Sequence, residues 1–208
     1  DRCHGVEQGG YHHDDVFLHT LRTVQLTRAD LTLRLAALCH DLGKPATARG
    51  GGFPGHEEAG AELAGGLLGR LRLPGSTAAA VARLVRLHLR PVYYEPEWSD
   101  GAVRRLARAA GEEIWLLLEL ARADIGASSY PRPEKIDELT DRVHAVLAER
   151  PDRFSLPLDG DDVMSALGLA PGPEVGRVKA ELEELVLDGV LPPDREALLR
   201  HLAGRHSS

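Results

Sequence analysis

The chain has 208 residues, enough for one large domain or for one domain with a small appendage. Its net charge of −7 argues against a strong, non-specific nucleic-acid binder, and no run of about 18 apolar residues suggests a membrane-spanning protein. Hydrophobic residues make up 43% of the chain and aromatic residues only 4%, so leucine and alanine must fill the core, and both favour helices.

Helical patterns separated by turn signals begin near the N-terminus. Residues 14–26 predict a first helix capped by Asp14 or Asp15, and Asp30 predicts the cap of a second helix that ends near Leu42. The apolar stripe expected along this second helix consists of Leu31, Leu35, Leu38 and Leu42.

The rest of the chain reads as helical too. The glycine-rich segment 48–55 lacks the pattern of a phosphate-binding P-loop, so we expect a plain loop there. Further helices are expected over about 56–71, 77–89, 100–110, 112–125 and 134–150. Residues 150–160 are predicted to be a linker to short helices in the tail. The predicted fold class is therefore all-α, with one helical domain over 1–150 and a helical extension over 151–208.

Three polar side chains lie on helix faces that should be apolar. His88 continues a face formed by Val81, Leu84 and Val85; Asp124 extends one formed by Ile114, Leu117, Leu118 and Ala121; His19 shares a side with Val16, Thr23 and Leu26. A buried carboxylate is costly unless a cation is close to it. Taken singly, each histidine is more often a hydrogen-bonded core residue than a ligand, and Asp124 could pair with a nearby arginine.

Further histidines turn these residues into an ordered set. The adjacent pair His40 and Asp41, and then His56, complete the order H…HD…H…H…D over consecutive helices. This order resembles the HD-domain family of metal-dependent phosphohydrolases, including the two middle histidines of its two-metal members. The segments "HDLGKP" and "GHEEAG" resemble that family too. The resemblance implies an HD-domain helical bundle over residues 1–150.

A closer resemblance covers about residues 8–203. The segments "HHDDVFLHTL" and "LVRLHLRP", with the tail from "LPLDGDDV" onward, are similar to the HD domain and following stretch of bacterial tRNA nucleotidyltransferases (CCA-adding enzymes) and of poly(A)-polymerase-like proteins. The nucleotidyltransferase head has no counterpart in these residues, so nucleotide addition is not assigned to them. Because the chain begins with Asp1 and its one methionine is Met164, we expect part of a longer polypeptide or a product freed of its tag.

The resemblance also implies metal ligands. They are His19, His40, Asp41 and Asp124 for one divalent ion, and Asp41, His56 and His88 for a second. Imidazole with carboxylate suits Mn²⁺, Ni²⁺, Co²⁺, Fe²⁺ or Zn²⁺, and Mg²⁺ is compatible with the weaker site. The expected mechanism is attack on phosphorus by a hydroxide generated between two cations, so the bridging Asp41 is also a catalytic residue.

Other polar residues near the doublet are candidates for substrate contact. Lys44 is expected to reach a phosphate oxygen and act in catalysis, although a lysine at a helix C-terminus is also an ordinary feature. Arg90 and Arg122 are weaker candidates for substrate binding. His12 and His13 match no ligand position and are expected at the surface or behind the ligands.

The resemblance implies a metal-dependent phosphohydrolase acting on nucleotide or RNA-end phosphates, as a 2′,3′-cyclic phosphodiesterase, 2′-nucleotidase or phosphatase. The alternative is the RNA-positioning part of a tRNA-processing nucleotidyltransferase, with tRNA as partner and a metal site that is not catalytic. A third alternative is hydrolysis of a deoxynucleoside triphosphate or a signalling nucleotide. Cys39 is expected to pack in the core, and two cysteines without framework spacing favour a reducing, cytoplasmic location.

Overall fold

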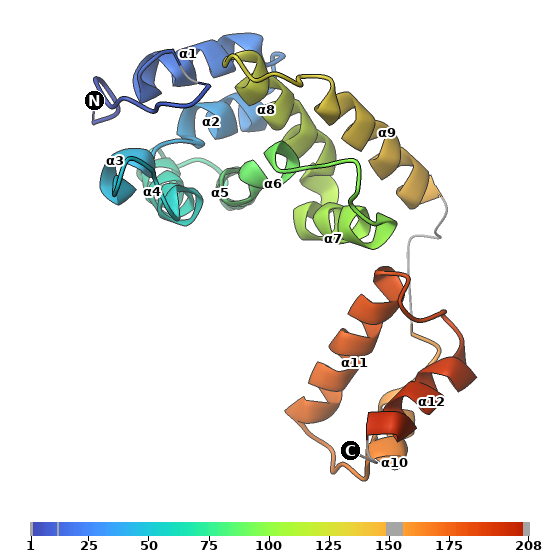
Figure 1. Ribbon diagram of the computed structural model, residues 1–208. Helices are drawn as coiled ribbons and strands as arrows, with labels where there is room; N and C mark the ends of the chain where they lie inside the picture. Colours follow the sequence, from blue (N-terminus) through green and yellow to red (C-terminus); the bar gives the residue numbers. More distant parts are fainter. Residues whose placement is uncertain (1, 12, 149–155, 206–208) are drawn as a thin grey trace. The chain divides into compact units, whose positions relative to one another are not determined.

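The computed structural model describes residues 2–11, 13–148 and 156–205, and the elements found in these ranges are helices. This confirms the predicted all-α class. The chain divides into two compact units (Figure 1). Residues 1–95 and 107–140 form the first unit, and residues 96–106 and 141–208 form the second.

The first unit is built around one central helix. Its elements are α1 (Val16–Leu26), α2 (Leu31–Cys39), α3 (Lys44–Thr47), α4 (His56–Arg70), α5 (Gly75–Leu87), α6 (Leu89–Val92), a 3₁₀ turn (Gly111–Glu113) and α8 (Ile114–Gly126). Helix α2 packs against α1, α4, α5 and α8, and α1 also packs against α8 (Figure 1). Helices α7 (Asp100–Ala110) and α9 (Lys135–Ala148) each contribute residues to both units.

Aspartate caps begin the first two helices. Asp15 accepts a hydrogen bond from the backbone N–H of Leu18 at 2.8 Å, and Asp30 accepts one from Leu33 at 2.9 Å. These bonds satisfy backbone donors that have no partner inside the helix. Of the two caps proposed for α1, the structure uses Asp15.

The buried face of α2 differs from the expected stripe. Leu31 and Leu38 are 62% and 43% exposed, and the side chains that α2 buries are Leu33, Ala36, Ala37 and Cys39. Apolar residues occur all round this helix, so periodicity alone did not select a face. The two alanines let neighbouring helices approach closely, and this orientation also turns His40 inward.

Helices α2 and α5 each end directly before a predicted histidine ligand. The helix expected to reach Leu42 ends at Cys39, and the short α3 begins at Lys44. In the same way α5 ends before His88, and α6 follows it with Pro91 inside rather than after the helix. Because a helix end leaves carbonyl oxygens without partners, each break offers an acceptor to the histidine that follows.

The tail forms three helices in the second unit: α10 (Gly160–Leu167), α11 (Pro173–Leu187) and α12 (Arg195–Arg205). Their shared core consists of Leu158, Val163, Val175, Leu182, Val186, Leu198 and Leu202. The predicted domain boundary at residue 150, and most of the predicted linker, fall in 149–155, outside the described residues, so the division stays a prediction. None of the helices in the described part of the chain is long and apolar enough to cross a membrane.

Candidate metal centre

All six predicted ligands meet inside the first unit. His19 lies on α1, His40 and Asp41 follow α2, His56 begins α4, His88 separates α5 from α6, and Asp124 lies on α8. Each of the six residues is at most 8% exposed. Five helices therefore converge on one buried polar cluster, which would be costly without a compensating charge.

Four side chains form the first group of ligand atoms. His19 Nε2 lies 2.9 Å from Asp124 Oδ1 and 3.4 Å from His40 Nε2. Asp41 Oδ2 lies 3.2 Å from His40 Nε2 and 3.9 Å from His19 Nε2. The ligand atoms of His19, His40 and Asp41 all lie within 4.8 Å of one another, and Asp124 Oδ1 stands beside them, 3.8 Å from His40 Nε2.

The other oxygen of Asp41 belongs to a second group. Asp41 Oδ1 lies 3.4 Å from His56 Nε2 and 3.9 Å from His88 Nε2, and these two nitrogens are 3.3 Å apart. Oδ1 is buried and accepts no hydrogen bond from the described residues. One carboxylate therefore supplies an oxygen to each of two groups that could hold a metal ion, as a bridging ligand does.

Backbone carbonyls fix the histidine tautomers. His40, His56 and His88 each donate their Nδ1 hydrogen to the carbonyl three residues earlier, at 2.7, 2.8 and 2.6 Å. A carbonyl only accepts, so in the neutral rings the proton is on Nδ1 and the lone pair is on Nε2. With the proton on Nδ1 of both rings, His56 and His88 would point two Nε2 lone pairs at each other, a repulsion that a bound cation would relieve.

The charges in the cluster also favour a cation. Burial alone would raise the pKa of Asp124, but the hydrogen bond with His19 and the charge of His40 lower this pKa to about 2. Burial is likewise outweighed at Asp41, whose pKa lies well below its usual range because of the charge of His40, the hydrogen bond with His40 and the charge of Lys44. Both carboxylates are thus anionic at neutral pH.

The pKa values of His40 and His88 are shifted in opposite directions. Burial would lower the pKa of His40, but the carboxylates of Asp41 and Asp124 raise it to about 9. Burial lowers the pKa of His88 to about 4, with the charge on His40 adding to the effect. A metal ion would take the place of the proton on His40, whereas His88 is neutral and ready to bind.

The donor set fits divalent ions of the first transition row. Ligand atoms about 2.1 Å from such an ion lie about 3.0–3.4 Å from one another, depending on geometry. The shortest separations within the two groups, from 2.9 to 3.4 Å, fall close to this range. Bound cations there would polarise phosphate oxygens and lower the pKa of water. The number and identity of the ions, and the ligand assignments, remain proposals.

The helical bundle and its histidine–aspartate centre define a metal-dependent hydrolase superfamily. Residues 16–145 match the HD domain family, and the chain belongs to that family. It is also similar to the A-adding tRNA nucleotidyltransferase of Deinococcus radiodurans, with 38% identity over 93% of this chain and 47% of the relative. The CC-adding tRNA nucleotidyltransferase of Thermus thermophilus is 37% identical over 93% of this chain and 46% of its own length.

These matches confirm the two resemblances expected from the sequence. A third relative, the Multifunctional CCA protein of Polaromonas naphthalenivorans, is 31% identical over 65% of this chain. The chain spans about half the length of the first two relatives that it matches. Both of these matches cover more of the chain than the HD domain does, so the similarity includes residues outside the metal centre.

Lys44 stands beside the bridging carboxylate. It is 8% exposed, and its Nζ donates hydrogen bonds to Asp41 Oδ2 at 2.7 Å and to Gln8 Oε1. Lys44 also lines a cavity of about 410 Å³ that Asp41, His88 and Asp124 reach. The lysine is therefore placed where a phosphate oxygen could meet it, and its catalytic role stays a prediction.

The two arginines have other surroundings. Arg90 is exposed on α6 and is absent from the lining of this cavity. Arg122 is exposed on α8, donates to Asp137, and lines a different cavity beside Arg28 and Glu119. Their contact with substrate stays a prediction, to which the cavity adds no support. Cys39 is buried, as expected for core packing, and burial raises the pKa of its thiol to about 11.

Several lining residues were not anticipated. The cavity of about 410 Å³ that Lys44 lines is also lined by Gln8, Gly9, Gly10, Tyr11, Leu89, Val92, Tyr93, Ile125, Ser128 and Tyr130. Six of these follow His88 or Asp124 within six residues along the chain. Three of these ten residues are tyrosines, of which the chain has four, and that rarity was the one signal that could have singled them out.

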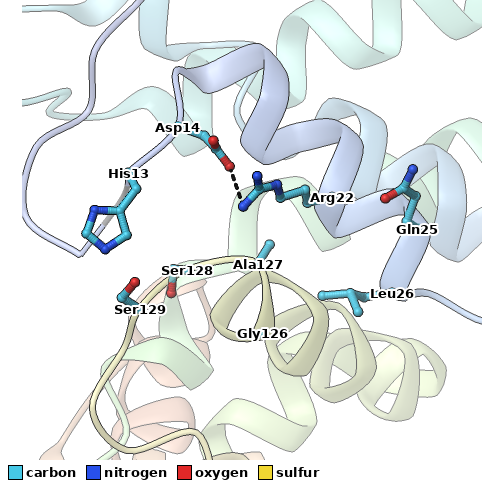
Figure 2. A pocket seen from close by; sticks show the side chains of 9 residues that line it. All are labelled: His13, Asp14, Arg22, Gln25, Leu26, Gly126, Ala127, Ser128 and Ser129. Atoms are coloured by element: carbon cyan, nitrogen blue, oxygen red, sulfur yellow. Dashed lines mark ion pairs between the residues drawn. The ribbon is translucent and has the colours of Figure 1, made fainter.

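A separate cavity of about 330 Å³ contains His13 (Figure 2). Figure 2 shows Asp14 paired with Arg22, with Ser128 and Ser129 across the cavity from α1. None of the six predicted ligands lines this cavity. His13 is exposed, in line with the surface position expected for it, and His12 lies outside the described residues.

Proposed function

We propose that this chain is a metal-dependent phosphohydrolase acting on nucleotide or RNA-end phosphates, of the 2′,3′-cyclic phosphodiesterase, 2′-nucleotidase or phosphatase type. The observation that carries the proposal is Asp41, whose two oxygens face two separate groups of ligand atoms. Two bound divalent ions would supply Lewis-acid polarisation of the phosphate and a more acidic water. A phosphate ester is the substrate class that this pairing of cations serves.

The protein's own residues would bind and orient the phosphate. The positive charge of Lys44 is held beside Asp41 by a 2.7 Å hydrogen bond, so it is already in place when a phosphate enters. Nζ of lysine has three hydrogens, and Asp41 and Gln8 accept from two of them. The third is available to a non-bridging phosphate oxygen, where it would stabilise charge that grows in the transition state.

The test is hydrolysis by metal-loaded protein of 2′,3′-cyclic AMP, 2′-AMP, 3′-AMP and p-nitrophenyl phosphate, with Mn²⁺, Ni²⁺ and Co²⁺ in turn. His40→Ala and Asp41→Ala should each abolish hydrolysis, because one loses a ligand and the other loses the shared bridge. Helical content, measured by circular dichroism, should remain largely intact. His13→Ala is the matched control, because His13 is exposed and belongs to neither group. Full activity in either of the first two variants would refute the assignment.

A second candidate function is positioning of tRNA, with a metal site that is not catalytic. It is supported by the similarity to tRNA nucleotidyltransferases over 93% of the chain, including residues beyond the HD match. Tight tRNA binding that weakens steeply with salt, without turnover of any phosphate ester, would favour this function. Turnover of a cyclic or 2′-phosphate with weak tRNA binding would favour the hydrolase.

A further inference from the structure

Tyrosines gather around the cavity beside the candidate metal centre. The chain has four tyrosines, and three of them, Tyr11, Tyr93 and Tyr130, line this one cavity. Tyr11 is 51% exposed and Tyr93 is 65% exposed. Isolated exposed aromatic residues are common in soluble proteins. Three around one cavity, in a chain that is only 4% aromatic, instead indicate a binding surface.

Each of the three tyrosines lies, along the sequence, next to a helix that carries or directly follows a predicted metal ligand. Tyr93 caps the C-terminus of α6, which begins directly after His88. Tyr130 follows α8, which carries Asp124, and Tyr11 precedes α1, which carries His19. The aromatic wall, meaning Tyr11, Tyr93 and Tyr130, lines the same cavity as the predicted ligands Asp41, His88 and Asp124.

Two of the three rings are held in place. Lys135 is only 1% exposed, and its Nζ donates to the Tyr130 hydroxyl at 2.9 Å and lies 4.7 Å from the ring centroid. The rings of Tyr11 and Tyr130 meet edge to face, with centroids 5.2 Å apart. The Ser129 N–H also donates to the Tyr11 carbonyl at 2.9 Å. Rings fixed in this way lose little freedom when a ligand binds.

We infer that the aromatic wall binds the base of a nucleoside phosphate whose phosphate group lies beside Asp41 and Lys44; this rests on the proposed function. One cavity of about 410 Å³ contains both the wall and these two residues, a volume in the range of small-molecule sites, about 300–1,000 Å³. Aromatic faces stack on any base, so the wall selects for the presence of a base rather than for its identity. The substrate class is thus a free nucleotide or the terminal nucleotide of an RNA.

The test is calorimetric titration of the metal-loaded full chain with two probes: 2′-AMP, which has a base, and glycerol 2-phosphate, which has none. We expect 2′-AMP to bind at least about tenfold more tightly. Tyr11→Leu and Tyr93→Leu should each weaken 2′-AMP binding by about tenfold and leave glycerol 2-phosphate binding unchanged. Tyr11→Phe and Tyr93→Phe keep the ring and should bind as the parent chain does. Phe17→Leu, which changes an exposed ring outside this cavity, should have no effect.

The outcomes separate this inference from the proposed function. Equal affinity of the parent chain for the two probes, or equal loss of both probes in the leucine variants, would overturn the base-binding wall. Base-dependent binding that the leucine variants lose supports the wall even in a chain that hydrolyses no phosphate ester, and in that case only the hydrolase is refuted. Hydrolysis of both probes with the same KM would refute the wall and leave the hydrolase standing.

Discussion

The backbone of Gly43 lies against the carbonyl of His56, so close that a β-carbon at position 43 would stand 2.1 Å from the His56 oxygen and 2.7 Å from the nitrogen of Gly60. Only glycine permits this contact, since the atoms it would meet are backbone and cannot turn aside. The turn that follows Asp41 is thereby packed directly onto the start of α4, which places His56 opposite Asp41 Oδ1.

Gly43→Ala should therefore disturb the second ligand group. We expect a loss of about 1–3 kcal/mol in the free energy of unfolding, because the overpacked backbone must move. Binding of one metal ion should weaken strongly while the group around His19 keeps its ion. The control is Gly65→Ala on α4, where a β-carbon meets nothing within 4 Å and should add about 0.5–1 kcal/mol of stability. Thermal unfolding and metal analysis measure both effects; equal behaviour of the two variants would contradict the prediction.

Metal stoichiometry tests the two groups separately. His56→Ala removes a nitrogen from the second group and leaves the first untouched, so bound metal should fall from two ions per chain to one. Metal at about 100-fold above its dissociation constant should stabilise the parent chain by about 2.7 kcal/mol for each bound ion, and each ion should raise the melting temperature by about 5–10 °C. Elemental analysis and thermal scans with and without a chelator check both numbers. Retention of two ions by His56→Ala would contradict the assignment.

The burial of the six predicted ligands could be inferred from the sequence. A histidine or aspartate on an apolar stripe, as at His88 and Asp124, is visible in the sequence since burial of an unpaired polar group is costly. Their convergence was inferred from the order of the motif, and the structure places all six together. The all-α class followed in the same way from abundant leucine and alanine and from clear caps such as Asp30.

Other features of the structure cannot be predicted from the pattern of residues along the sequence. The face of α2 was predicted wrongly, since Leu31 and Leu38 are as apolar as the buried Leu33 and only tertiary packing distinguishes them. The break after Cys39 was missed because the turn there depends on Gly43 meeting α4. Tyr130 could not be placed beside the metal centre, because loops follow no periodicity that fixes where their side chains point.

Replacement of Lys44 separates substrate binding from metal binding. Lys44→Met keeps much of the side-chain length but removes the charge beside Asp41, so hydrolysis should fall by about 10- to 100-fold. Two metal ions should still bind, because the ammonium group of lysine is not a ligand. The control is Lys179→Met, which changes a lysine in the tail and should keep full activity. Loss of metal from Lys44→Met would instead show that Lys44 supports the ligands, and unchanged turnover would exclude a catalytic role.

The N-cap of α1 should make stability depend on pH. Asp15 Oδ1 accepts from the N–H of Leu18 and Oδ2 accepts from the N–H of Gly5 at 2.7 Å, and these bonds lower the pKa of this carboxyl below its usual value. A lowered pKa in the folded state gives stability that is present above the unfolded pKa and is lost as the pH falls through the folded one. Asp15 therefore stabilises α1, and the segment before it, at neutral pH and ceases to do so in acid.

Asp15→Asn isolates this effect, because asparagine is also a good cap but carries no charge at any pH. The parent chain should melt at a higher temperature than the variant at pH 7, and the difference should shrink as the pH falls from 5 to 3. All other carboxylates titrate in both proteins, so the difference between them reports Asp15 alone. Circular dichroism melts at half-unit pH steps make the measurement. A difference that stays constant or widens in acid would mean that the charge of Asp15 contributes nothing to the cap.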